Sequence, residues 1–76
     1  MKPDPIVDLL DQLIDGQKEK LLKSARQIVP HVTQDDLMQP NDFSQLEFHP
    51  LFRYEEGTLD GLCVAKAAIL ALMREI

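Results

Sequence analysis

The residues of this chain that could do chemistry are two histidines, one cysteine and several carboxylates. His49 lies near Glu47 and Glu55 in the sequence, and His31 is the only other imidazole. A metal site built from histidine and carboxylate ligands is therefore one hypothesis. The chain has no Glu-x-x-His or HExxH motif and no zinc-ligand spacing. We expect no metal and no other cofactor, and keep a metal-binding or ligand-binding module that uses His31 and His49 as an alternative.

The other candidate groups have structural explanations. Cys63 falls in an apolar segment with no histidine three or four residues away, so we interpret it as a small hydrophobic residue rather than a nucleophile. Asp8, Asp11 and Asp15 recur at helical spacing, which is typical of a solvated helix face. No glycine-rich phosphate loop or Gly-x-Ser-x-Gly motif occurs. We expect no catalytic residues and no enzymatic activity.

Length and composition predict one small domain spanning residues 1–76. A chain of 76 residues can build only a thin core, and its single cysteine allows no internal disulfide. An unpaired thiol and an N-terminus without secretory-signal features predict a cytoplasmic protein. The longest apolar run is too short to cross a bilayer, so we expect no membrane partner.

Negative charge is concentrated in the second half of the chain. The formal net charge is −5, and the excess lies between residues 35 and 60. Such a region repels nucleic acid, so a partner recognised by charge would be basic. The predicted acidic patch comprises Asp35, Asp36, Asp42, Glu47, Glu55, Glu56 and Asp60.

Two long stretches have the character of helices. Asp4 followed by Pro5 is a typical helix start, and apolar residues recur at helical spacing from there to Pro30, which ends the pattern. This predicts one helix over about 5–29, although the sequence leaves open whether Gly16 breaks it. The second long helix is predicted over about 52–74.

The intervening segment, 30–50, is predicted to form one or two short helical turns packed against the long helices. Thr33 and Asp36 have the spacing of a capping box. A connection of this length is unusual as an idle loop in so small a domain. The residues expected to point inward are Leu37, Met38, Phe43, Leu46 and Phe48.

The last helix carries two unlike apolar faces. A small-residue face, predicted to pack closely against the first helix, comprises Gly57, Gly61, Ala65 and Ala68. A large face, predicted to be the interaction face, comprises Leu59, Leu62, Lys66, Ile69, Leu70 and Met73. Either the 30–50 segment or a second molecule should cover this large face, with Lys66 at the rim.

The sequence therefore predicts an all-α antiparallel helical hairpin. We expect a small acidic protein-protein interaction or regulatory module without catalytic activity, whose partner is another protein or a second copy of the chain. A purely structural homodimer that forms a four-helix assembly is the alternative.

Overall fold

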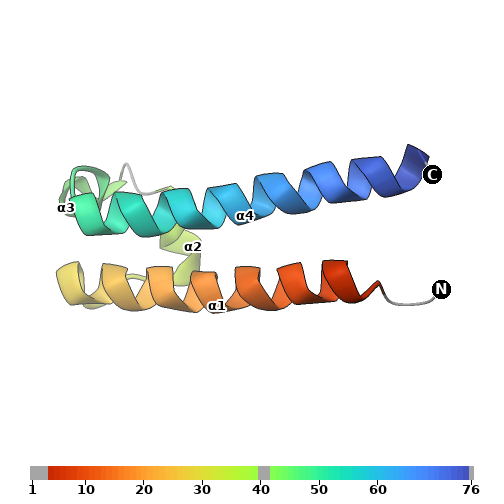
Figure 1. Cartoon of the computed structure of the whole chain (residues 1–76). Coiled ribbons are helices and arrows are strands. Elements are labelled where there is room, and N and C mark those ends of the chain that lie inside the picture. The colour runs from red at the N-terminus through yellow and green to blue at the C-terminus, as the bar shows by residue number, and fades with distance from the viewer. Residues whose placement is uncertain (1–3, 40–41, 76) are drawn as a thin grey trace.

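Two long helices lie side by side and run in opposite directions (Figure 1). The computed structural model describes residues 4–39 and 42–75. The long helices are α1 (Pro5–Ile28) and α4 (Pro50–Glu75), and two single-turn helices, α2 (Gln34–Leu37) and α3 (Ser44–Glu47), lie in the connection. No strand occurs among the described residues. The predicted all-α helical hairpin is confirmed, with α4 beginning slightly earlier than expected, at its proline.

The boundaries of α1 follow from the residues at its ends. The Asp4 side chain accepts hydrogen bonds from two backbone N–H groups of the first turn, at 2.8 and 3.2 Å, and Pro5 occupies the first turn, where a missing N–H costs nothing. The helix runs unbroken through Gly16. It ends where Val29 adopts an extended conformation just before Pro30.

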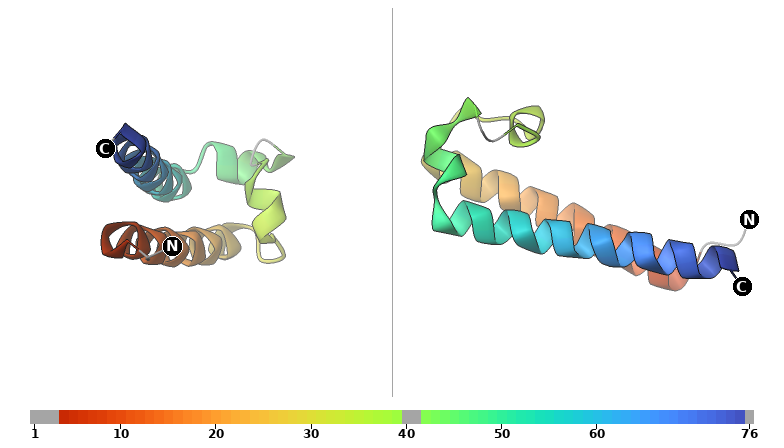
Figure 2. Two further views of the ribbon diagram at one scale, coloured as in Figure 1. Left: turned by 90° about the vertical axis from the view of Figure 1, so that its right-hand side faces the viewer. Right: turned by 90° about the horizontal axis from the view of Figure 1, so that it is seen from above.

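The connection is tied to the long helices by local caps and hydrogen bonds. The predicted capping box is present, since the Thr33 N–H donates to Asp36 Oδ2 at 2.9 Å and the Asp36 N–H donates to Thr33 Oγ1 at 3.4 Å. Gln34 Nε2 donates to the Lys18 carbonyl at 3.4 Å, which links α2 to α1. Seen end-on, α2 and α3 lie to one side of the α1–α4 pair (Figure 2).

The core sits at the closed end of the hairpin, where the connection joins the long helices. Phe52, Leu46 and Val32 are completely buried there. The other buried members of this cluster are Leu21, Ala25, Val29 and Leu37, with Leu22, Ile28, Phe43 and Leu59 packed against it. The open end, which carries both termini, consists of the two long helices alone (Figure 1).

Two residues of the connection do not point inward as expected. Met38 is 82% exposed and Phe48 is 78% exposed, whereas Leu37 and Leu46 are buried. Each of α2 and α3 is a single turn, so it can direct only a narrow sector at the core. Met38 and Phe48 follow directly after those turns and fall outside that sector.

The molecule is more extended than a compact domain of its length. Its radius of gyration is 14.6 Å, against about 11 Å expected for 76 residues. Its accessible surface is 5710 Å², whereas a compact monomer of 8.7 kDa exposes about 4,700 Å². The hairpin therefore leaves about 1,000 Å² more surface in water than a globular chain of this mass.

Candidate functional site

The large face of α4 packs against α1 within the same chain. Five of its members, Leu59, Leu62, Lys66, Ile69 and Leu70, are half-buried, and Met73 is 39% exposed. The expectation that the connection or a second molecule covers this face is therefore wrong for most of its length, because α1 lies on it. Leucine and isoleucine remove more apolar area from water than glycine and alanine do, so the large face gives the more favourable contact.

The small-residue face of α4 points away from α1. All four members, Gly57, Gly61, Ala65 and Ala68, are exposed. A Cβ atom added to Gly57 or to Gly61 would meet nothing within 4 Å. The prediction that these residues mediate close packing against the first helix is wrong.

Lys66 joins the two helices near the open end. Its ammonium forms an ion pair with the Asp11 carboxylate at 2.5 Å, and both side chains are partly exposed. The hydrogen bond from Lys66 to Asp11 raises the pKa of Lys66 above its ordinary value of 10.5. The Lys66 ammonium therefore has a partner on α1 in the same chain, which the sequence interpretation missed.

A buried polar contact lies midway along the helix pair. Gln17 Nε2 donates to Glu55 Oε2 at 2.6 Å and to the Glu55 carbonyl at 3.0 Å. Gln17 is 9% exposed and Glu55 is 8% exposed. The two residues are 38 positions apart in the sequence, so no local pattern indicated their pairing.

The predicted acidic patch is divided by these contacts. Glu55 is buried and is not part of the surface, which corrects its assignment. Asp36 is held in the capping box, and Glu56 pairs with Arg53 at 2.8 Å. Glu47 is half-buried, and the exposed members are Asp35, Asp42 and Asp60.

Exposed aliphatic side chains form a row on one flank of α1, while those of α4 are scattered and include Val64, 69% exposed, outside the row that contains Leu72. On α1, Ile6 is 58% exposed, Leu9 is 56% exposed and Leu13 is 47% exposed. On α4, Leu72 is 57% exposed and continues the row of small residues that begins at Gly61. We call these two flanks together the uncovered face, formed by Ile6, Leu9, Leu13, Lys20, Tyr54, Gly61, Ala65, Ala68 and Leu72.

Helical geometry places both flanks on the side opposite the connection. At 3.6 residues per turn, Lys18 and Leu22 lie on one flank of α1, and the Ile6 row lies on the other. Likewise Phe52 and Leu59 lie on the flank of α4 opposite the Gly61 row. The connection bonds to Lys18, and Leu22, Phe52 and Leu59 belong to the core that it covers.

The uncovered face is therefore the side of the helix pair that α2 and α3 leave open (Figure 2). None of these nine residues is acidic and Lys20 is the only charged one, while the exposed Glu75 follows Leu72 by three residues at the end of α4. Tyr54, 70% exposed, is its only aromatic residue. Acidic residues are therefore sparse on this face, although the chain has 13 of them.

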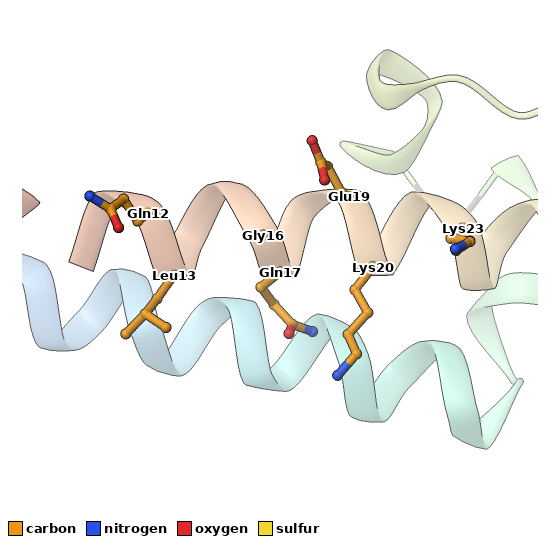
Figure 3. Close-up of a pocket in the computed structure, with 7 residues that line it drawn as sticks. All are labelled: Gln12, Leu13, Gly16, Gln17, Glu19, Lys20 and Lys23. Atoms are coloured by element: carbon orange, nitrogen blue, oxygen red, sulfur yellow. The ribbon is translucent and has the colours of Figure 1, made fainter. Parts of the chain in front are cut away.

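A shallow hollow beside Gly16 adjoins this face (Figure 3). Leu13, Gln17 and Lys20 project from α1 toward α4, while Glu19 points away. The side chains that line the hollow do not converge on one point, so we assign it no ligand.

The histidines and the cysteine are not assembled into a site. His31 is exposed after α1, and His49 is half-buried before α4. The side chain of Glu55, the predicted ligand beside His49, accepts a hydrogen bond from Gln17. Cys63 is exposed, and its interpretation as a small hydrophobic residue rather than a nucleophile stays a prediction. In the described ranges, no cluster of three or more histidine, cysteine or acidic side chains has a metal-binding arrangement. None of the helices described is both long and apolar enough to span a bilayer.

Three comparisons with known proteins found no match. No protein-family model matches the chain, and neither a curated protein nor a solved structure resembles it significantly.

Proposed function

We propose that this chain is a small protein-protein interaction or regulatory module that has no catalytic activity and binds through the uncovered face. The observation that carries the proposal is the exposure of Ile6, Leu9, Leu13 and Leu72 on the one side of the hairpin that the connection does not cover. Contiguous exposed apolar surface of this kind marks interaction sites in soluble proteins.

The charge distribution supports a protein as the partner. The net charge of −5 disfavours nucleic acid, and the nine residues that form the uncovered face include a lysine and no acidic residue. The exposed carboxylates Asp35, Asp42 and Asp60 lie elsewhere, where they can attract basic groups of a partner at the edge of a contact.

The test compares the wild-type chain with a Leu9→Ser/Leu13→Ser variant. Both leucines are about half exposed, so their replacement should leave the circular dichroism spectrum unchanged. We expect the wild type to self-associate in light scattering or to bind a hydrophobic fluorescent dye, and the variant to lose that property. A wild-type chain that is strictly monomeric and binds no dye would remove the support for an interaction face.

A further inference from the structure

We infer that the partner of the uncovered face is a second copy of this chain, stacked on it with two-fold symmetry as a four-helix assembly. This inference rests on the proposed function and names the occupant of the same face. The inference rests on the surface area of the chain, on the arrangement of large and small side chains, and on the position of Lys20.

The excess surface of the whole chain is close to the area that a stable dimer buries on each partner. The chain exposes 5710 Å², about 1,000 Å² more than a compact monomer of its mass. A standard stable interface buries about 800 Å² on each partner. A second copy on the uncovered face would therefore bring each chain close to the exposed area of a globular protein.

The two flanks of the uncovered face are complementary in size. Three large side chains, Ile6, Leu9 and Leu13, project from α1, while Gly61, Ala65 and Ala68 form a low row on α4. Both rows are exposed, so each has room for side chains from another molecule.

The rows also lie at the same heights along the hairpin. The contacts of Asp11 with Lys66 and of Gln17 with Glu55 bracket the register of the two helices, since long side chains span six residues of α1 against eleven of α4. Between these contacts Leu13 lies level with about Gly61, and the next turns place Leu9 beside Ala65 and Ile6 beside Ala68. The spacing of four and then three residues is the same in both rows.

These heights make the face self-complementary. A two-fold axis that runs along the hairpin, between α1 and α4, turns the chain over without shifting its height. It therefore lays α1 of one copy on α4 of the other and sets Leu9 of each over Ala65 of its partner. Such an interface closes on itself, because the same patch serves both chains.

The two-fold rotation also brings Lys20 of the uncovered face to a favourable neighbour. In the register that sets Leu13 level with about Gly61, Lys20 lies seven residues further along α1 and Tyr54 seven residues back along α4, so the two are about level. The two-fold axis brings Lys20 of one copy over the Tyr54 ring of the other. An ammonium over an aromatic face is a favourable contact.

Sedimentation equilibrium of the full chain in the micromolar range tests the assembly. We expect the wild type to have twice the chain mass of 8.7 kDa. Ala65→Lys should weaken the dimer at least about 100-fold, because each dimer would bury two added ammonium groups. The matched control is Ala67→Lys, another exposed alanine of the same helix on the opposite flank, and it should leave the dissociation constant unchanged.

Disulfide trapping tests the orientation. One protein carries Leu9→Cys and another carries Ala65→Cys, and Cys63→Ser removes the native thiol from both. Opposed α-carbons at about 4.4–6.8 Å allow a disulfide, so oxidation of the mixture should give a covalent heterodimer. Replacing the second protein by one with Ala67→Cys should abolish it.

The outcomes separate this inference from the proposed function. Suppose that the wild type is a monomer that binds the hydrophobic dye, and that the Leu9→Ser/Leu13→Ser variant no longer binds it. This result would refute a second copy as the partner and would still support the interaction face. A monomer without dye binding would overturn both. A dimer that Ala65→Lys and Ala67→Lys affect equally would overturn the stacking on the uncovered face.

Discussion

Replacing Gln17 by leucine should destabilise the protein even though it adds an apolar side chain to a helix interface. The Gln17 amide donates to a Glu55 carboxylate oxygen at 2.6 Å, and both residues are more than nine-tenths buried. Leucine cannot donate, so the carboxylate would lose that partner in a site where water cannot fully replace it.

The magnitude follows from the two bonds that are lost. A hydrogen bond to a charged group contributes about 1.5–3 kcal/mol, and this is the main loss. The second bond, to the Glu55 carbonyl, matters less because that oxygen can also accept within α4. We expect Gln17→Leu to cost about 2 kcal/mol, a large part of the roughly 4–11 kcal/mol that a chain of 76 residues has.

The assay is a double-mutant cycle in urea, followed by circular dichroism at one fixed protein concentration. Glu55→Leu alone should cost about 1–3 kcal/mol because the buried Gln17 amide then keeps only its bond to the backbone carbonyl of residue 55. The double variant, Gln17→Leu with Glu55→Leu, should be close to wild type or more stable, since no polar group is then left unpaired. Additivity of the two single changes within about 0.5 kcal/mol would refute the contact.

Two further predictions concern the exposed glycines and the ion pair. Gly57→Ala and Gly16→Ala should each raise the free energy of unfolding by about 0.5–1 kcal/mol, because an added Cβ has free space at both positions and alanine is the better helix former; a loss of stability at Gly57 in urea would show that a neighbour contacts it. The raised pKa of Lys66 predicts that the ion pair stabilises the fold fully below pH 10.5 and ceases to do so as the pH rises through the raised value. The melting temperature of Asp11→Asn should therefore lie below that of wild type at neutral pH and converge with it in strong alkali. An Asp60→Asn control should show no such convergence. A difference for Asp11→Asn that stays constant with pH would contradict the pairing.

The helices themselves could be predicted because their signals are local. Asp4 with Pro5 and the Thr33 capping box each act within one turn, and the structure places a helix start at both. Apolar periodicity kept its phase through Gly16, and the helix is unbroken there. These features depend on backbone geometry and neighbouring side chains alone.

The faces of α4 could not be predicted from the same information. Its apolar arc is wide, so a helical wheel permits either the Leu62 sector or the Ala65 sector to meet α1. The choice depends on how much area each contact buries, which is a property of the pair of helices. Gln17 and Glu55 were missed for a similar reason, since each resembles an ordinary surface residue until α1 and α4 are aligned.

The position of the core gives the hairpin a gradient of local stability. Phe52, Leu46 and Val32 are sealed at the closed end, whereas both termini lie at the open end, where two helices cover each other only in part. Fraying from the termini can therefore proceed inward along α1 and α4 together without exposing the core.

The same gradient of local stability predicts an order in which the parts of the chain fold. The closed end brings together residues from the connection and the adjoining turns of the long helices, so its loops are the shortest to close and cost the least chain entropy. We therefore expect the open end to join last and its backbone amides to exchange first with solvent.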